Sequence, residues 1–461
     1  MNTFTPKQRF ALASLSLSIL LPSLATSIAN VALPTLAQAF QASFQNVQWI
    51  LLAYLLAITT LIVTVGRLGD LAGRRRLLLA GVLLFTVASV LSGTSSSLWF
   101  LVAARAAQGL GAAAMMALAM AFVAQTVPNH KIGRAMGLLG AMSAMGTALG
   151  PSLGGVLIAN FGWRSIFFIN LPLGLLTFLL TYRHLPADRP FSTIYPPRFD
   201  TFGTLLLALT LSIYALSMTI GRGILGLANL ALLLAAAFGA RLFVRVERRA
   251  ADPLLPLEVL RNATLTAAFA KSTLVSTVVM ATLVVGPFYL AGTLALHPAD
   301  VGLVMSSGPF VAALAGIPSG RIVDHFGTRR TSIVGIIAMA VGTSCLASLP
   351  TTLGVTGYIA SLIVLTAGYS LFLAANNTAA MTNSGPLEPG VISGILNFSR
   401  FLGLITGASV MGNVFALASS STNTPQAVAA GMRTTFAVGT VLLLAAVTIA
   451  AWEFKLSEGR R

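Results

Sequence analysis

Charged residues are scarce in this sequence. They make up 8% of its 461 residues, whereas a soluble globular domain carries roughly 25%. Hydrophobic residues make up 56% instead. A chain with so little charge does not cover a water-exposed surface, so the composition excludes a soluble protein and indicates an integral membrane protein.

Cysteine is nearly absent as well. Cys345 is the single cysteine and lies in an apolar run, which excludes a disulfide within the chain and a cysteine-based metal site. We expect no soluble domain, because the longest polar connections, about 183–200 and 245–262, are too short to bury a core. The first apolar segment begins near Arg9 and lacks a small-residue cleavage site, which favours a retained helix over a signal peptide.

Long apolar segments fill most of the chain. Crossing a hydrocarbon core takes roughly 20 residues, and cutting the chain at its polar and Gly/Pro-rich breaks leaves about fourteen segments of that length. We therefore predict an all-α integral membrane protein with about fourteen transmembrane helices. The predicted spans are 10–33, 46–66, 77–95, 99–125, 133–158, 164–182, 201–219, 224–244, 263–291, 301–320, 331–349, 354–377, 390–417 and 432–452.

The distribution of Lys and Arg predicts the topology. Basic residues collect in alternate loops together with the tails, while the opposite loops hold only Arg164, Arg222 and Arg433. Basic loops stay on the cytoplasmic side, so we expect both termini in the cytoplasm. The net charge of +17 does not indicate nucleic-acid binding, because charges spread over short loops orient helices and meet anionic lipid headgroups.

An eleven-residue phrase occurs twice, each time between apolar segments. It occupies 66–76 and 320–330, and six of the eleven positions agree. Such a repeat indicates duplication. The copies follow the second and the tenth span. A duplication of six helices would place the second copy after the eighth span, so two helices are additional. We predict a six-helix bundle at 1–190, an inserted helix pair with linkers at 191–250, and a second six-helix bundle at 251–461.

These residues resemble a known family. The pattern G-x-L-x-D-x-x-G-R-R at 66–75 resembles the loop signature of the major facilitator superfamily. The stretches Asn30–Pro34, Gly146–Gly155 and Trp163–Pro172 are similar to motifs of its fourteen-helix drug:proton antiporter branch. The resemblance covers nearly the whole chain. It implies two six-helix bundles built as inverted repeats, and multidrug or solute export in exchange for protons.

The repeated phrase also has a physical rationale. Its glycines allow tight turns, and Asp70 or Asp324 can accept hydrogen bonds from a helix N-terminus or pair with the arginines that follow. Such a cluster can latch one side of a rocking carrier shut. The alternative is that the charges only set topology, but an Asp in both copies favours the latch. The predicted gating residues are Gly66, Asp70, Gly73, Arg74, Arg75, Gly320, Asp324, Gly327 and Arg330.

The fifth span carries a stripe of small residues. Gly146, Gly150, Gly154 and Gly155 leave one helix face nearly bare backbone, which predicts close helix packing. Pro151 removes a backbone hydrogen bond and predicts a kink. The family resemblance implies that this helix lies at the interface between the halves.

Three basic residues lie within spans: Arg105, Lys271 and Arg400. Each is costly in lipid unless it faces a cavity or a partner. The family resemblance implies a role for Arg105 in proton coupling. All eleven acidic residues fall in loops, tails or span ends, and Ala25 stands where relatives of this branch often carry an Asp. We therefore expect an electropositive central cavity. Further candidates for its lining are Asn30, Tyr289, Asn376, Asn377 and Asn397.

These residues predict a secondary active transporter. We expect alternating-access export of an amphiphilic organic solute, anionic or zwitterionic. Without a phosphate-binding loop the driving force should be an ion gradient, and the resemblance implies protons. Lys271 is the titratable one of the three cations and our candidate proton carrier. The alternatives are efflux of cationic or neutral hydrophobic compounds, a non-transporting sensor, and, for each cation, a purely structural role.

The sequence also limits the partners. It has no set of nucleophile, base and acid at one depth and no His-rich cluster, so we expect no enzyme activity, no metal and no cofactor. The expected partners are a small-molecule substrate, protons and membrane lipid. We expect a monomer in a bacterial cytoplasmic (inner) membrane.

Overall fold

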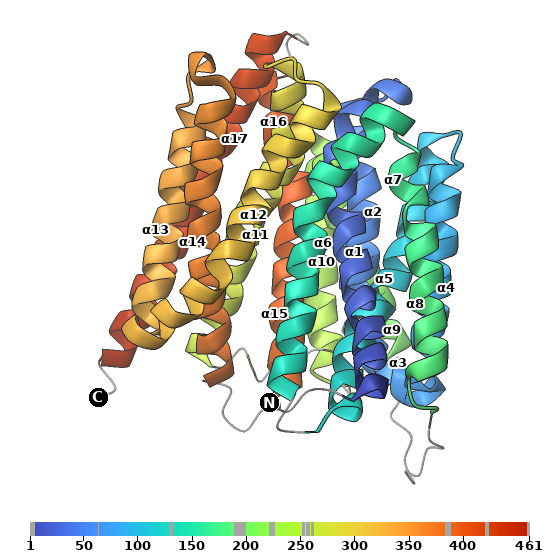
Figure 1. Ribbon diagram of the computed structural model, residues 1–461. Coiled ribbons are helices and arrows are strands. Elements are labelled where there is room, and N and C mark those ends of the chain that lie inside the picture. Colours follow the sequence, from blue (N-terminus) through green and yellow to red (C-terminus); the bar gives the residue numbers. More distant parts are fainter. Residues whose placement is uncertain are drawn as a thin grey trace.

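The computed structural model describes residues 5–62, 64–128, 132–188, 200–220, 226–250, 254, 259, 262–382, 389–419 and 424–458. These residues form helices and short turns, with no strand among them. Fourteen of the described helices are long and apolar enough to cross a membrane, which confirms the predicted class and number. The helices stand side by side, and both chain ends lie at one face (Figure 1). We call this face the termini side and the opposite face the far side.

The chain forms two groups of helices with a pair between them. The first half contains α1 (Pro6–Ala39), α2 (Phe44–Ile62), α3 (Val65–Ala72), α4 (Arg74–Gly93), α5 (Leu98–Thr126), α6 (Ile132–Phe161), α7 (Ser165–Phe168) and α8 (Asn170–His184). The pair is α9 (Thr201–Thr219) and α10 (Leu227–Glu247). The second half contains α11 (Ala263–Gly292), α12 (Pro298–Phe326), α13 (Thr328–Ala347), the short turn η3 (Thr351–Leu353), α14 (Gly354–Thr382), α15 (Pro389–Thr406), the π-helical turn η4 (Gly407–Met411), α16 (Gly412–Ser419) and α17 (Pro425–Glu458).

Local sequence explains where several helices begin. Thr5 and Gln8 form a reciprocal capping box at the start of α1, with Pro6 in the first turn. Ser97, Asp200 and Asn262 each cap the helix that follows them with a side-chain oxygen. Between these ends the helices satisfy their own backbone groups, as a lipid environment requires.

The first copy of the repeated phrase departs from the expected simple turn. Residues 65–72 form the short helix α3, in which Val65 is buried and Leu68 is half-buried. This i, i+3 spacing gives the segment one apolar face that can lie against the bundle. The charged connection between α2 and α4 is therefore an amphipathic helix followed by Gly73.

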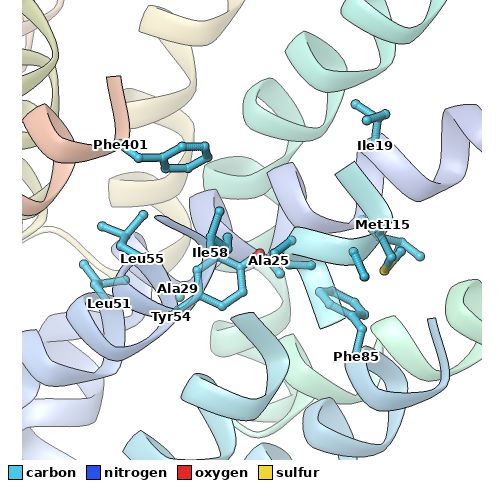
Figure 2. Close-up of a cluster of buried hydrophobic side chains, with 14 of the residues drawn as sticks. Ile19, Ala25, Ala29, Leu51, Tyr54, Leu55, Ile58, Phe85, Met115 and Phe401 are labelled. Atoms are coloured by element: carbon cyan, nitrogen blue, oxygen red, sulfur yellow. The ribbon is translucent and has the colours of Figure 1, made fainter. Parts of the chain in front are cut away.

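The largest apolar core lies inside the first half, and the second half adds to it. Figure 2 shows part of this cluster, in which α1 contributes Ile19 and Ala25, and α2 contributes Leu51 and Leu55. Phe401 of α15 belongs to the same cluster. The second half also has apolar clusters of its own, one of which includes Val31 of α1. Each half therefore contributes residues to the main core of the other.

Candidate functional site

Two lateral seams join the halves. On one, α6 packs against α12, and on the other α2 packs against α15. In Figure 1, α6 lies beside α12 at the front of the molecule. Any movement of one half against the other must change these two contacts.

The α6/α12 seam is tight on the far side. A Cβ atom at Gly155 would lie 2.5 Å from the carbonyl oxygen of Pro298, and one at Gly302 would collide with the carbonyl of Pro151. The other small residues of α6 face α1 instead, where side chains at Gly150 and Gly154 would collide with Ser27 and Ile28. The predicted close packing of this motif is confirmed. One face of the motif packs on α12 and the other packs on α1.

The proline in α6 is compensated by a serine of α1. Because Pro151 has no N–H, the carbonyl of Thr147 loses its donor in the helix. The Ser27 hydroxyl donates to that carbonyl at 2.7 Å. Ser23 and Ser143 are joined one turn away at 2.9 Å. These bonds hold α1 and α6 together at the Pro151 position.

Toward the termini side the same two helices separate. Gly137 lies five turns from Gly155 on the same face of α6, and Gly320 lies five turns from Gly302 on α12. A Cβ at Gly137 or Gly320 would meet nothing within 4 Å. The halves are therefore in contact on the far side and diverge toward the termini side.

An aromatic cluster closes the far side between the halves. The ring of Phe44 in α2 lies 4.7 Å from that of Phe288 and 5.0 Å from that of Phe415. One turn along α2, the Gln48 amide lies directly against Gly412 of α16. Both amide atoms of Gln48 are buried without a hydrogen-bond partner among the described residues. The far-side closure thus buries polar groups that water would satisfy if the halves separated there.

Arg105 is completely buried inside the first half. Its Nε donates to the Ile50 carbonyl at 3.2 Å, and its Nη1 donates to Oε1 of Gln108 at 2.5 Å. The guanidinium carbon lies 4.1 Å from the centre of the Tyr54 ring, a cation–π distance. All three contacting groups are neutral. Nη2 is buried and has no hydrogen-bond partner in the described part of the chain.

A second layer of hydrogen bonds fixes the Arg105 surroundings. Gln108 and Asn170 both donate to the Ser89 hydroxyl at 2.9 Å, and Ser89 donates to the Phe167 carbonyl at 3.0 Å. The Tyr54 hydroxyl donates to the carbonyl of Pro22 in α1 at 3.0 Å. The network links α1, α2, α4, α5 and α8. We name Arg105, Tyr54, Gln108, Ser89 and Asn170 the arginine network.

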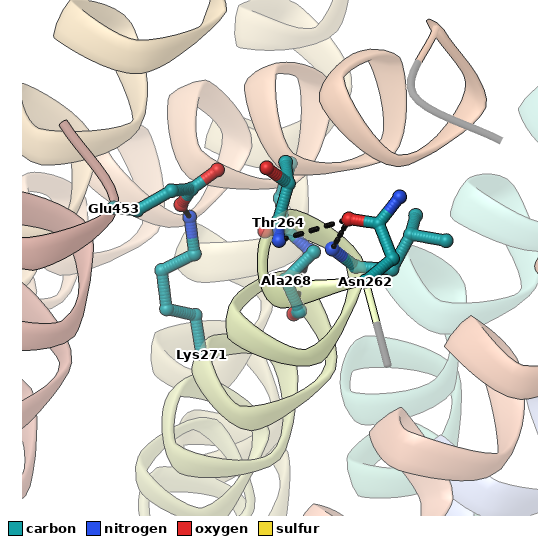
Figure 3. Close-up of polar contacts among 7 residues, drawn as sticks. Asn262, Thr264, Ala268, Lys271 and Glu453 are labelled. Atoms are coloured by element: carbon teal, nitrogen blue, oxygen red, sulfur yellow. Dashed lines mark hydrogen bonds and ion pairs between the residues drawn. The ribbon is translucent and has the colours of Figure 1, made fainter. Parts of the chain in front are cut away.

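Lys271 is not the unpaired cation that the sequence led us to expect. Its Nζ lies 2.6 Å from Oε2 of Glu453 in α17, and the two side chains are 4% and 7% exposed (Figure 3). The expectation that no carboxylate faces the cations within the membrane is therefore wrong. Glu453 lies at the end of its span, but the packing of α17 on α11 buries its carboxylate beside Lys271.

The remaining candidates are dispersed. Arg400 and Asn377 are exposed, and Asn397 is half-buried. Asn376 donates from Nδ2 to the Ala268 carbonyl at 3.1 Å, within the second half. The buried Tyr289 stacks on Tyr358 with ring centres 5.9 Å apart. The structure thus does not gather the predicted cavity residues around one point.

Asn30 differs from the other three candidate asparagines. It is fully buried in α1, and neither of its amide atoms has a hydrogen-bond partner among the described residues. An unsatisfied buried amide is costly. Asn30 is therefore a candidate for contact with water or a ligand in another conformation.

The two copies of the repeated phrase share their backbone but not their contacts. Gly73 and Gly327 both have positive φ, 94° and 80°, immediately before a helix, which explains why glycine occupies these positions. In the second copy Asp324 and Arg330 are exposed, and a Cβ on Gly320 or Gly327 would meet nothing within 4 Å.

In the first copy a distant carboxylate caps the helix. Asp188, which follows α8, accepts from the backbone N–H groups of Arg75 at 2.8 Å and Arg76 at 3.1 Å. The Arg75 guanidinium donates to the Tyr182 carbonyl. Gly66 and Asp70 lie in α3, and the structure does not describe their surroundings. The latch role of Asp70 stays a prediction, and Asp188 is a residue that the sequence did not indicate.

The tight far-side seam gives a direct test. Replacing Gly302 by Ala is expected to cost about 1–3 kcal/mol of stability, because the new methyl meets rigid backbone atoms of α6. The matched change Gly316→Ala adds the same methyl four turns along, where nothing lies within 4 Å, and is expected to be neutral or slightly stabilising. Thermal unfolding in detergent measures both. Equal effects of the two variants would contradict the assigned packing.

Two helical halves that meet at paired seams, closed on one side and parted on the other, define a membrane carrier. The sequence model of the Major Facilitator Superfamily matches residues 15–408 and, in an overlapping second match, 268–461. The chain belongs to the major facilitator superfamily. It is therefore a multi-pass membrane transporter for small molecules and not an enzyme.

Relatives and solved structures agree with this assignment. The multidrug resistance protein Stp of Mycobacterium tuberculosis (strain H37Rv) is 32% identical over 91% of this chain and 78% of its own length. The riboflavin transporter RibZ of Clostridioides difficile is 29% identical over 89% of each chain. The inward-facing, unoccupied structure of a bacterial homologue of the human lysosomal transporter Spinster has a TM-score of 0.70, with 16% identity over 97% of each chain.

Proposed function

We propose that this transporter exports an amphiphilic organic solute, anionic or zwitterionic, across the bacterial cytoplasmic membrane in exchange for protons. The observation that carries the proposal is the buried Arg105 guanidinium, whose contacts are all neutral. A buried charge without a counter-ion marks a functional site in a membrane protein. Its Nη2 retains hydrogen-bonding capacity for an anionic group.

Alternating access is supported by the asymmetry of the seams. The far side is closed by Phe44, Phe288 and Phe415, while α6 and α12 separate toward the termini side. With both termini in the cytoplasm, as the basic loops predict, this is a conformation that receives cargo from the cell interior. Opening of the far side would then hydrate Gln48 and release the cargo outside.

The charge preference rests on Arg105 rather than on three cations. Glu453 neutralises Lys271, and Lys271 turns toward α17, which packs on α11, α13 and α16 rather than on the first half. Arg400 is exposed, so its charge is not enclosed by the protein as that of Arg105 is. One buried positive charge still favours an anionic or zwitterionic cargo over a cation.

A second candidate function is efflux of cationic or neutral hydrophobic compounds. The Lys271–Glu453 pair favours it, because pairing lowers the net positive charge within the membrane. Relatives named for drug efflux, such as JefA of Mycobacterium tuberculosis at 31% identity, are in keeping with either candidate.

Transport by the purified protein distinguishes the two candidates. Proteoliposomes with an imposed pH gradient are loaded with either an anionic dye, carboxyfluorescein, or a cationic dye of similar size, rhodamine 6G. We expect gradient-dependent movement of the anion and little movement of the cation. Movement of the cation alone would reject the anionic proposal, and movement unaffected by collapsing the gradient would reject proton exchange.

A further inference from the structure

The inserted helix pair makes the two seams unequal. Helix α9 packs on α2 in the first half and on the turn η4 in the second half. The Tyr214 hydroxyl of α9 donates to Oγ1 of Thr406, at the end of α15, at 3.1 Å. Leu207, Leu211 and Ala215 of α9 are buried in the apolar cluster that Figure 2 shows in part. Helix α9 therefore covers the α2/α15 seam.

The α6/α12 seam has no such cover among the described helices. Apart from each other, α6 and α12 pack only on helices of their own halves and on α1. On the termini side, a Cβ atom added at Gly137 or Gly140 of α6, or at Gly316 of α12, would meet nothing within 4 Å. Gly140 is exposed there, although Ile158, five turns along on the same face of α6, is buried. The space between the helices is therefore open on this side.

One face of α12 beside this opening has an amphiphilic pattern. Phe310 and Leu314 are each 63% exposed, and Arg321 is exposed near the termini-side end of the helix. The spacing i, i+4, i+11 places the three on one face. An anion with an apolar tail can lie along this face with its charge at Arg321 and its tail toward the membrane centre.

We propose that an amphiphilic anion dissolved in the membrane reaches the space between the halves laterally, through the α6/α12 seam on the termini side, while α9 blocks the α2/α15 seam. This proposal rests on the proposed function for the class of cargo. It goes further by assigning the route and by giving the inserted helix pair a role. The inserted pair makes access one-sided.

Quenching of a fluorescent label tests the route without any transport. In a Cys345→Ala background, a single cysteine replaces either Gly140, beside the α6/α12 seam, or Gly394, on α15 of the covered seam. A Cβ atom at either position meets nothing within 4 Å, so a bimane label fits at each, and the two seams differ in the packing of α9 on α2 and η4. The labelled proteins are reconstituted in phosphatidylethanolamine/phosphatidylglycerol vesicles. The probe is doxylstearate with its nitroxide at mid-chain, which is an amphiphilic anion and a contact quencher.

We expect doxylstearate to quench the label at Gly140→Cys several-fold more strongly than the label at Gly394→Cys, while aqueous iodide quenches both. Adding Arg321→Gln should reduce the quenching at Gly140→Cys. Equal quenching at the two positions, stronger quenching at Gly394→Cys, or none at either overturns the proposal. Equal quenching at Gly140→Cys by a phosphatidylcholine with the same nitroxide overturns the assignment to a single-chain anion. A failed dye-transport experiment would leave these results unchanged, so the two proposals can fail separately.

Discussion

Replacement of Arg105 by Met is expected to lower transport of the anionic dye by about ten- to a hundredfold, because it removes the buried charge and the Nη2 donor that we assign to the cargo, and one hydrogen bond from a charged group contributes about 1.5–3 kcal/mol, where about 1.4 kcal/mol is tenfold. The substitution also removes the hydrogen bonds to the Ile50 carbonyl and to Gln108, which lowers the stability of the first half. Arg105→Lys keeps the charge but not the planar fork, so we expect an intermediate rate. Initial rates in proteoliposomes measure both variants.

The control for this prediction is another arginine beside an aromatic ring. Arg164 lies over Trp163 at 4.4 Å and donates to the Ser95 carbonyl, on the far side and partly exposed. Arg164→Met should leave the transport rate within a few-fold of the unmodified protein. The role assigned to Arg105 would be refuted if Arg105→Met, still folded by size-exclusion chromatography, transported as fast as Arg164→Met.

The fold was largely predictable because its signals are local or periodic. Each span is an apolar run of sufficient length, and the repeated phrase marks equivalent places in two halves. The glycines of the repeated phrase predict tight turns, and Gly73 and Gly327 both have positive φ immediately before a helix. Helix α3 was not predicted. The repeated phrase was interpreted as a turn, and the i, i+3 spacing of its apolar residues indicates a helix only if the segment is taken as helical.

The contacts of the candidate site were less predictable, because they join residues far apart in sequence. Glu453 lies 182 positions from Lys271, and Asp188 lies 113 positions from Arg75. Composition near either residue gives no sign of the other. Gln108 is different, since its i+3 spacing from Arg105 on a helix places both side chains on one face. That pairing could have been predicted from the sequence.

The inserted pair shows the same division between local and distant information. Its two helices follow from apolar runs, whereas its position does not. Only the contacts of α9 with α2 and η4, and the Tyr214–Thr406 hydrogen bond, place it over one seam. The count of helices predicted a pair in addition to two sets of six, and the structure shows that α9 of this pair contacts helices of both halves.

Removal of one partner of the Lys271–Glu453 pair is expected to cost about 3–5 kcal/mol of stability, because it leaves an uncompensated charge in a buried place. Lys271→Met and Glu453→Leu each remove one charge, and the first leaves a buried carboxylate. The double variant Lys271→Met/Glu453→Leu replaces the pair by apolar groups and should recover most of the loss. Thermal unfolding in detergent measures the cycle, and additive losses in the double variant would contradict a direct pair.

The same variants decide whether the pair also carries the proton. A proton on Glu453 would break the ion pair, so a coupling role requires both groups, whereas a structural role requires only that the site be neutral and filled. If the double variant regains stability but loses gradient-driven transport, the pair takes part in coupling. If it regains both, Lys271 and Glu453 only join α11 to α17, and proton exchange must be sought in the arginine network around Arg105.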